Sequence, residues 1–512
     1  MRFLFHGVML LVLLLCQGAW ADTLEAQDTP QLKSSAVIQL EQGNIQGVVR
    51  AKVGHYLGIA YAQPPVGPLR WQPPQTVQAH NGVRQASSFG PACWQPRSDN
   101  QPALNMSEDC LTLNIWAPLK PQESLPVMVW IHGGGFTSGS GQINGQALAE
   151  QGVIVVSFNY RLGPLGFLQH PALDTPIANF GLLDAVQALR WVNTNIASFG
   201  GNPNNVTLFG VSAGGMMVNL LLVNEQAQGL FHKAIPQSGY LSWPLPTTES
   251  QSDKRVMDMN GTPVPTAEAL AKALTQTLFD TPPTQAELQS LPAPALIDAV
   301  TGFYRPVVDG NTLQDQPYRL LRRQPPRIPV MTGGNSFEGS VMPYSGLSVE
   351  AYKRYWKGDY SSLTARYQTD FAHSEVRGFQ RAFGDERYLL SAYVTGQAWQ
   401  KTKQPAWLYY ITLADNDHPG APHGRDAYLL FNGHESERRQ DQVLTQQLRQ
   451  YWANFARTGN PNGEGLPAWP AYTAKDKQWL MLGETVTQGA VKPESLELLE
   501  QKITEREHFP ER

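Results

Sequence analysis

The chain alternates short, almost wholly apolar segments with longer amphipathic ones, and this alternation restricts its fold more than any other feature. Short runs rich in Val, Ile and Leu are typical of strands buried on both faces. We expect such strands at residues 111–116, 126–131, 153–160, 206–209, 328–331, 407–411 and 479–482, after a strand pair over 37–50 that is broken at Gly43 and Asn44. Helical periodicity lies between them at 182–195, 214–223 and 440–457. The pattern predicts an α/β fold with a mostly parallel, twisted central sheet and helices on both faces.

Composition excludes several classes of function. Of the 512 residues, 42% are hydrophobic and 16% are charged, which suits a chain with a large core and not a disordered one. The formal net charge is −4, and no basic stripe or cationic amphipathic face stands out. Nucleic acid is therefore not expected as a partner.

The first 21 residues have the layout of a secretory signal peptide. Arg2 precedes an apolar run at 8–15, and Ala19-Trp20-Ala21 precedes Asp22. The run is too short for a membrane span, which disfavours an uncleaved anchor. Lipid attachment at Cys16 is disfavoured because bulky Leu15 precedes it. We expect cleavage near Ala21 and a secreted or periplasmic protein, in which a polar segment at 22–36 precedes one domain at 37–500.

Cleavage would remove one of the three cysteines and leave Cys93 and Cys110. Two cysteines close together in an exported chain favour a single disulfide, which stabilises the fold by restricting the unfolded state. The alternative is two separate thiols.

A Gly-x-Ser-x-Gly pentapeptide occupies residues 210–214, between an expected strand and an expected helix. In that setting a sharp turn projects the serine hydroxyl from the edge of a sheet, and the glycines leave room for the strained backbone. The pentapeptide makes Ser212 a candidate nucleophile. The alternative is a chance match to a short pattern.

A glycine-rich loop, His132-Gly133-Gly134-Gly135-Phe136, follows the expected strand at 126–131. Consecutive glycines can aim several backbone N–H groups at one point, which suits a developing oxyanion or a phosphate. The phosphate interpretation lacks its usual partner, because no Gly-Lys dipeptide occurs in the chain. Together with the serine turn, the loop is better explained as an oxyanion donor.

With these motifs the chain resembles the type-B carboxylesterases of the α/β-hydrolase fold, the group that contains cholinesterases and bacterial para-nitrobenzyl esterases. The resemblance spans about residues 37–485. Its matching stretches are 108–114, 159–167, 199–206, 229–235, 451–456 and 469–472. It implies an α/β-hydrolase fold in which large insertions form a substrate gorge.

The resemblance also implies a catalytic triad. Ser212 corresponds to the nucleophile, and Glu338, in the stretch 333–339, to the acid. His423, in Gly420-Ala421-Pro422-His423, corresponds to the histidine. The order Ser, Glu, His along the chain is the one expected for this fold. Glu338 as a solvated loop carboxylate, and His418 or His434 in place of His423, are the alternatives.

Further positions carry over from the family. The oxyanion donors implied are the backbone N–H groups of Gly134, Gly135 and Ala213. Cys93 and Cys110 match the family's first disulfide. Ser238 stands where the family often has a buried supporting serine, and both a purely structural role and support of the catalytic groups remain open.

One departure bears on the substrate. The family usually has a glutamate immediately before the nucleophile, whereas this chain has Val211. A missing carboxylate lowers the negative potential beside the serine, so a cationic choline ester is not the expected substrate. The acyl and alcohol pockets are expected from residues 240–265, 282–304 and 342–387, where no motif identifies the ester.

The resulting hypothesis is a serine carboxylic-ester hydrolase that forms an acyl-enzyme on small to medium, uncharged or aromatic esters, with water as the second substrate. No metal or cofactor is implied, because the chain has neither a His-Glu-x-x-His motif nor cysteine pairs with ligand spacing. No transmembrane segment is expected. The alternative is a non-catalytic, cholinesterase-like binding protein, which the retained triad disfavours.

Overall fold

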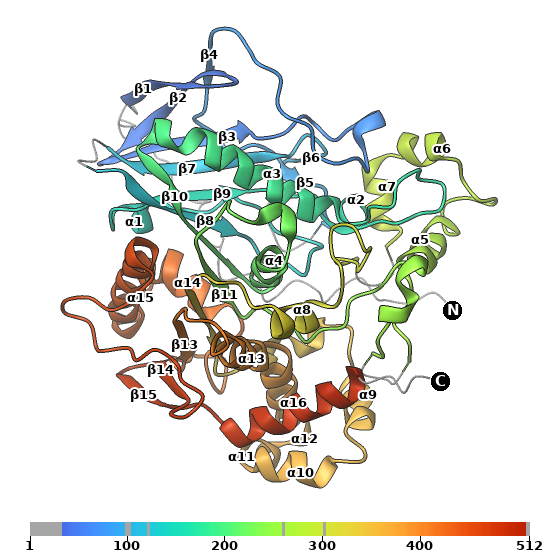
Figure 1. Cartoon of the computed structure of the whole chain (residues 1–512), viewed down its shortest axis with the longest axis vertical. Coiled ribbons are helices and arrows are strands. Elements are labelled where there is room, and N and C mark those ends of the chain that lie inside the picture. The colour runs from blue at the N-terminus through green and yellow to red at the C-terminus, as the bar shows by residue number, and fades with distance from the viewer. Residues whose placement is uncertain (1–32, 98–103, 120–122, 259–261, 301–303, 508–512) are drawn as a thin grey trace.

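The computed structural model describes residues 33–97, 104–119, 123–258, 262–300 and 304–507. The expected signal peptide at 1–21 lies outside these residues. The described chain is built around one large twisted sheet with helices on both sides of its central strands (Figure 1).

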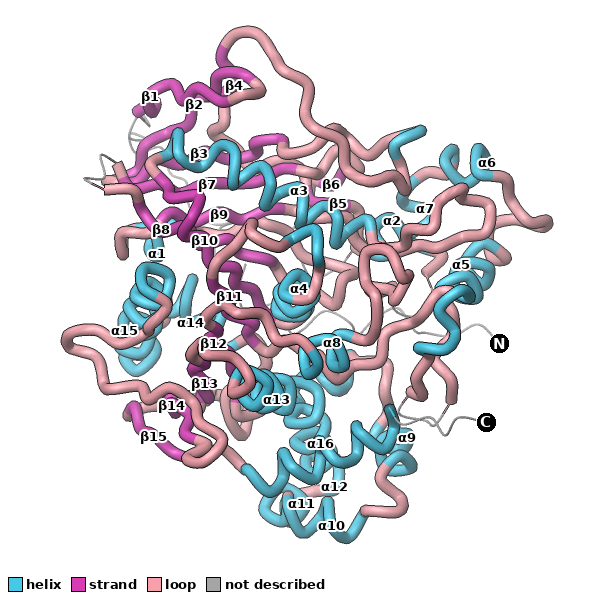
Figure 2. Tube along the Cα trace, in the orientation of Figure 1, coloured by secondary structure: helices cyan, strands magenta, loops and turns pink. Residues whose placement is uncertain are grey.

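The main sheet has 13 strands, and Figure 2 shows them crossing the molecule as a continuous band. In spatial order the strands are β1 (Lys33–Leu40), β2 (Gly43–Arg50), β3 (Val53–Ala60), β7 (Thr112–Pro118), β9 (Ile154–Phe158), β8 (Leu125–Ile131), β10 (Gly201–Val211), β11 (Lys233–Gln237), β12 (Val330–Asn335), β13 (Ala406–Ile411), β14 (Gln478–Leu482) and β15 (Val486–Ala490). Short β4 (Val83–Gln85) pairs with β2, and β5 (Ala92–Cys93) pairs with β6 (Met106–Ser107) in a separate small sheet.

The centre of the main sheet is parallel and its margins are antiparallel. Every neighbouring pair from β9 through β8, β10, β11, β12 and β13 to β14 is parallel. The pairs β1–β2, β2–β3, β3–β7, β7–β9 and β14–β15 are antiparallel. The carboxyl ends of the parallel strands therefore meet at one edge of the sheet, which is where α/β folds place their sites.

The central strands are apolar throughout because each buries both of its faces. Along β8, Val127, Val129 and Ile131 pack into one hydrophobic core, whereas the alternating Met128 and Trp130 pack into another. The same period-two division recurs along β13. The larger core lies under α3, α4, α8, α13 and α16, and the other under α14 and α15.

The described helices are α1 (Gln146–Ala149), α2 (Gly163–Gly166), α3 (Phe180–Asn195), α4 (Ala213–Leu222), α5 (Ala267–Thr275), α6 (Gln285–Ser290), α7 (Ala293–Asp298), α8 (Pro317–Arg323), α9 (Val349–Tyr355), α10 (Tyr360–Arg366), α11 (Gln368–His373), α12 (Glu375–Gly384), α13 (Leu390–Trp399), α14 (Arg425–Asn432), α15 (Arg439–Thr458) and α16 (Pro493–Glu507). Helices α5 to α7 and α9 to α12 lie away from the central band, in the long connections around β12 (Figure 1). No helix among the described residues has both the length and the apolar character of a membrane span.

The folded region begins and ends outside the range 37–500 that was expected for the domain. Strand β1 begins at Lys33, inside the segment that was expected to precede the domain, and α16 continues to Glu507, beyond residue 500. Polar residues at 33–35 still form a strand because β1 is an edge strand, in which only the backbone must pair. The Ser35 hydroxyl accepts a hydrogen bond from the Gly47 N–H (3.0 Å), which fixes this edge to β2.

The disulfide expected between Cys93 and Cys110 is confirmed, with 5.0 Å between the two Cα atoms. Both cysteines are buried in the larger core, beside the small sheet formed by β5 and β6. The bond ties β5 to the segment just before β7.

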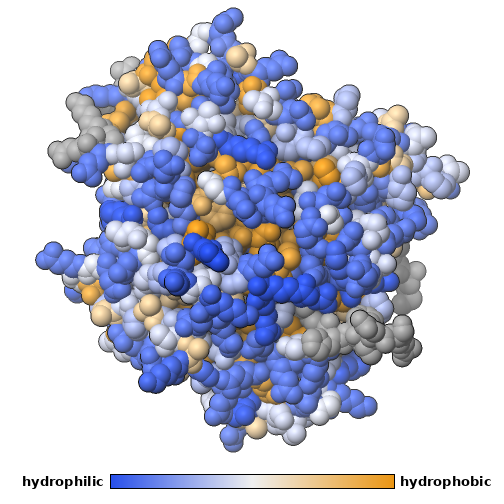
Figure 3. Space-filling view, in the orientation of Figure 1, coloured by the Kyte–Doolittle hydropathy of each residue, from blue (hydrophilic) through white to orange (hydrophobic). Residues whose placement is uncertain are grey.

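Most of the face in Figure 3 is covered by hydrophilic side chains, and hydrophobic ones are visible mainly between them near the middle.

Candidate active site

Ser212 lies at a sharp turn between β10 and α4. Its backbone has φ 58° and ψ −122°, a strained conformation for a residue with a side chain. The Ser212 N–H donates to the Gln237 carbonyl (3.0 Å), and its own carbonyl accepts from Met216 N–H (2.8 Å) in the first turn of α4. The turn is thus held between the end of β11 and the new helix, so the strain is maintained by bonds on both sides.

The glycines flanking Ser212 are required by close packing. A Cβ on Gly210 would lie 2.6 Å from the Ile131 carbonyl oxygen, and a Cβ on Gly214 would collide with the same atom. On the other side, a Cβ on Gly133 would approach the Ser212 Cβ to 3.2 Å. The glycine-rich loop and the serine turn therefore touch through their backbones, as the two motifs predicted.

Glu338 follows β12 and is almost fully buried, with 1% of its surface exposed. Its Oε1 accepts hydrogen bonds from the Ser238 hydroxyl (2.6 Å), the Asn335 backbone N–H (2.6 Å) and the Asn335 side-chain amide (3.0 Å). Three donors on one oxygen compensate the cost of burying the carboxylate and fix its orientation.

His423 contacts the other oxygen of the Glu338 carboxylate. Its Nδ1 is in short hydrogen-bond contact with Glu338 Oε2. Its Nε2 is buried and has no hydrogen-bond partner among the described residues. His418 and His434, the alternatives, lie elsewhere: His418 Nδ1 contacts Asp415 (2.9 Å), and His434 Nδ1 accepts from Arg449 (2.9 Å).

The loops that carry Glu338 and His423 are pinned to each other. Phe337 N–H donates to the Ala421 carbonyl (2.7 Å), and the residues Phe337 and Pro422 form an isolated parallel bridge. The His423 N–H donates to the Ser340 hydroxyl (3.0 Å). The imidazole and the carboxylate are thus held together by backbone as well as by side chains, although 85 positions separate them.

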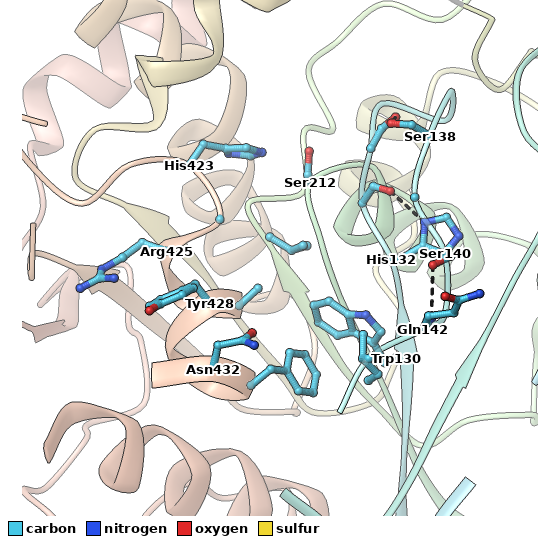
Figure 4. Close-up of a pocket in the computed structure, with 18 of the residues that line it drawn as sticks. Trp130, His132, Ser138, Ser140, Gln142, Ser212, His423, Arg425, Tyr428 and Asn432 are labelled. Carbon is cyan, nitrogen blue, oxygen red and sulfur yellow. Dashed lines mark hydrogen bonds between the residues drawn. The ribbon is translucent and has the colours of Figure 1, made fainter. Parts of the chain in front are cut away.

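Ser212 and His423 line the same cavity, which has a volume of about 660 Å³. In Figure 4 the imidazole of His423 is directed toward the loop that carries Ser212. The glycine-rich loop and Val211 also line this space, as do Tyr240, Val341 and Tyr388 from the connections around β12. A cavity of this size accommodates a small or medium organic molecule.

In the glycine-rich loop, the N–H groups of Gly134 and Gly135 point away from the groups that contact the loop's carbonyl oxygens. The Gly133 carbonyl faces His132 Nδ1 (2.8 Å), and the Gly134 carbonyl accepts from Thr137 and Ser138 N–H groups (both 3.0 Å). In a trans peptide the next N–H points opposite to the carbonyl, so the N–H groups of Gly134 and Gly135 face away from those partners.

Ala213 is the first residue of α4, where the N–H has no acceptor within the helix. Among the described residues, the hydrogen bonds of loops and turns include none donated by the N–H of Gly134, Gly135 or Ala213. Of the three residues, Gly134 and Gly135 line the cavity, and Ala213 directly follows Ser212, which also lines it.

The stability of the glycine-rich loop is expected to depend on pH through His132. Its ring stacks on Tyr160 (4.4 Å between centroids), and burial lowers the pKa of His132 from 6.5 to about 4. Between these values the unfolded chain binds a proton that the folded chain does not. The free energy of unfolding should therefore fall as the pH drops from 6.5 to 4, by about 3 kcal/mol for this group.

Urea unfolding of the wild type and of His132→Gln at pH 4.5 and 7.5 measures this contribution, because glutamine does not titrate. We expect the variant to lose less stability at the lower pH than the wild type does. An equal loss in both proteins would contradict the assignment.

Sequence analysis missed three residues around the Glu338–His423 pair. Asn335 bonds Glu338 and also reaches Asp426 (3.3 Å), and Asp426 accepts from the Tyr409 hydroxyl (2.6 Å). Burial raises the pKa of Asp426. Asn335 stands inside the stretch that identified Glu338, and Asp426 follows His423 by three residues, so proximity in sequence was a usable signal for both. Nothing in the local sequence pointed to Tyr409.

Comparisons with known proteins agree with this architecture. Residues 34–499 match the carboxylesterase family. The chain is 33% identical to pyrethroid hydrolase Ces2a of Mus musculus, over 93% of each chain. It is 34% identical to fumonisin B1 esterase of Sphingopyxis macrogoltabida, over 92% of this chain and 89% of that one.

Among solved structures, the chain is similar to a PNB esterase, with a TM-score of 0.77 and 30% identity over 91% of this chain and 99% of that one. The sheet order and the carboxylesterase relatives together confirm the α/β-hydrolase fold and favour an enzyme over a binding protein. The chain belongs to the carboxylesterase family and is a carboxylic-ester hydrolase.

Proposed function

We propose that the enzyme hydrolyses its ester by acyl transfer to Ser212 and then to water. His423 takes the proton of the Ser212 hydroxyl through Nε2 as the oxygen attacks the ester carbonyl, and returns it to the leaving alcohol. Glu338 orients the imidazole and stabilises its cation. In the second half, His423 activates a water molecule that attacks the acyl-enzyme and releases Ser212.

One observation carries this proposal. Glu338 occupies Nδ1 of His423 and so assigns the ring's proton to that side, while the unpartnered Nε2 lies in the wall of the cavity that Ser212 also lines. An imidazole that is held at one nitrogen and free at the other is arranged to accept a proton in the cavity. The alternative that Glu338 is a solvated loop carboxylate does not fit its 1% exposure.

The backbone N–H groups of Gly134, Gly135 and Ala213 are proposed to bind the tetrahedral oxyanion. Their support is that each N–H is free of acceptors in the described loops and turns and that the two segments touch beside Ser212. Preorganised donors of this kind need no rearrangement when the negative charge develops. Ser238 is proposed to support Glu338, since its hydroxyl is one of the three donors to Oε1.

The proposed substrates are small to medium, uncharged or aromatic esters, as opposed to cationic ones. Val211, immediately before Ser212, lines the cavity with an uncharged side chain. A quaternary ammonium ester would find no carboxylate at that position to offset its desolvation.

A matched pair of esters tests the proposal: butyrylcholine and its uncharged isostere 3,3-dimethylbutyl butyrate. We expect the wild type to hydrolyse the uncharged ester with a kcat/KM at least about tenfold higher, and Val211→Glu to narrow that ratio through attraction of the cation. Hydrolysis of neither ester would overturn the proposed function. A wild-type preference for butyrylcholine would overturn only the substrate class.

The enzyme is further proposed to be exported after removal of residues 1–21. The disulfide between Cys93 and Cys110 supports an oxidising compartment. N-terminal sequencing of the protein from the producing cells tests this, and a mature chain that retains the apolar run at 8–15 would refute it.

A further inference from the structure

Arg387 belongs to the cavity wall but has no role in the proposed mechanism. It lies in a π-helical turn, Asp385–Leu389, between α12 and α13. Such turns insert one residue into a helix, change the direction of side chains there, and are frequent at functional sites. Arg387 is therefore placed by an irregularity of the fold and not by a regular helical position.

Aromatic rings surround the guanidinium group of Arg387. Its Cζ lies 3.9 Å from the centroid of Trp243, 4.7 Å from that of Tyr240 and 5.4 Å from that of Tyr388. Cation–π contacts of this kind restrict the position of the cation. A side-chain hydrogen bond to Tyr240 uses part of the donor set of Arg387, and its other N–H groups, Nε among them, remain able to bind a carboxylate.

No carboxylate of the described chain neutralises Arg387. None of the ion pairs among the described residues includes it, and its Nε is buried without a hydrogen-bond partner there. The two acidic neighbours are engaged elsewhere: Asp385 pairs with Lys492 (2.7 Å), and Glu386 accepts from the hydroxyl of Tyr352 (2.5 Å).

A second guanidinium adds to the positive charge. Arg305 lies 5.6 Å from the centroid of the same Trp243 ring. Burial, and then the charge of Arg387, lower the pKa of Arg305 to about 10, so it stays protonated at neutral pH, and Asp258 offsets part of its charge. The two cations beside one indole ring repel each other. An anionic group on a bound ligand would relieve that repulsion.

The charge lies close to the reacting groups. The ring of Tyr388 contacts both Arg387 and His423, with 4.3 Å between the Tyr388 and His423 centroids. A single aromatic ring thus separates the guanidinium from the proposed general base. Ser212 and Arg387 line the same cavity, so a substituent on an ester bound at Ser212 occupies the space that Arg387 borders.

Other charges along the cavity do not compete for this role. Arg425 is paired with Asp441 (2.5 Å), and Arg50 is exposed to solvent at the rim. Glu435, the acidic residue of the described lining, lies 3.7 Å from His434. Arg387 is the cavity-lining arginine that combines partial burial with the absence of a carboxylate in the described chain.

We infer that the preferred esters carry a carboxylate, which Arg387 binds while the ester carbonyl lies at Ser212. This inference rests on the proposed function and extends its substrate class: besides uncharged esters, the cavity takes monoesters of di- or polycarboxylic acids, or esters of hydroxy acids, and prefers them. Aromatic contacts hold the cation in place before the substrate arrives, so the carboxylate gains charge-assisted hydrogen bonds at little cost in side-chain ordering.

Two matched pairs of substrates test the inference and locate the carboxylate. Mono-4-nitrophenyl adipate and 4-nitrophenyl hexanoate differ by a carboxylate on the acyl side. The butyrate ester of 6-hydroxyhexanoate and hexyl butyrate differ by one on the alcohol side. Each pair is assayed with the wild type, Arg387→Gln and the control Arg50→Gln, which removes the exposed cation of the same cavity.

We expect the wild type and Arg50→Gln to favour the anionic ester of at least one pair by about tenfold or more in kcat/KM. Arg387→Gln should abolish that preference, lowering kcat/KM for the anionic ester about 10- to 100-fold while the uncharged ester stays within about threefold.

Three results would overturn the inference: no anionic preference in either pair, a preference that survives Arg387→Gln, or an equal loss for both esters of a pair, which would indicate a structural role. If the wild type hydrolyses none of the four esters, the proposed function itself fails. Hydrolysis of the uncharged esters without discrimination leaves the proposed function intact and refutes the carboxylate site alone.

Discussion

Replacing Ser212 with alanine is expected to lower kcat for ester hydrolysis by about 10⁶-fold, because the acyl group then has no oxygen to which it can be transferred. Alanine keeps the Cβ and removes only the hydroxyl, which donates no hydrogen bond to the described protein. The turn at φ 58° is held by the backbone bonds to Gln237 and Met216, and neither involves the hydroxyl. The fold should therefore survive, with an unchanged circular dichroism spectrum and Tm.

A second serine of the same cavity provides the control. The hydroxyl of Ser140 lines the cavity and accepts from the Gln142 N–H (3.3 Å), so Ser140→Ala changes the same functional group outside the proposed triad (Figure 4). We expect this variant to retain activity within about threefold. If Ser212→Ala keeps more than a tenth of the wild-type activity, Ser212 is not the nucleophile.

Glu338→Gln is expected to lower kcat by about 10³- to 10⁴-fold while leaving KM nearly unchanged. Three donors converge on Oε1, so the amide oxygen of glutamine should take that position and its NH₂ group should face His423 Nδ1. The imidazole must then carry its proton on Nε2, where it cannot accept one from Ser212. The loss arises from the wrong tautomer and not from a missing contact.

Ser238→Ala tests how Glu338 is held in position without changing the charge of its carboxylate. It removes one of the three donors to Oε1 and leaves both Asn335 donors and the carboxylate in place. We expect a loss within about tenfold. Steady-state kinetics with one uncharged ester gives kcat and KM for the wild type, Glu338→Gln and Ser238→Ala. Equal activities of Glu338→Gln and Ser238→Ala would contradict the proposed role of Glu338.

The parallel centre of the sheet was predictable because its strands are buried on both faces. Strands β8, β9 and β13 are nearly uninterrupted runs of apolar residues, and each lies within a residue or two of its expected position. Strand β11 was not predicted, since Lys233 and Pro236 interrupt a segment of five residues. Pairing with β10 and β12 stabilises this strand, and its own sequence does not indicate that pairing.

The site was predictable where chemistry imposes a local motif. Glycines around Ser212 and at residues 133 and 134 are required by close backbone contacts, and Gly135 has a positive φ of 65°, so these glycines form a pattern in the sequence. By contrast, the contact of Arg387 with Trp243 joins segments 144 positions apart. It also depends on a π-helical turn, which the hydrophobic periodicity of the sequence does not predict. Long-range packing of aromatic side chains decides the substrate pocket, and that is where sequence analysis found no motif.

Labelling with a diethyl organophosphate, followed by peptide mapping, tests the central claim most directly, because the reagent reacts much faster with a serine that is activated by a neighbouring base than with other side chains. The account predicts one diethylphosphoryl group per chain, on the peptide that contains Ser212, with loss of activity in proportion to labelling. It also predicts no label on that peptide in Ser212→Ala and slow labelling in Glu338→Gln. Ester hydrolysis that continues in the presence of the reagent, or inactivation through a different residue, would contradict it.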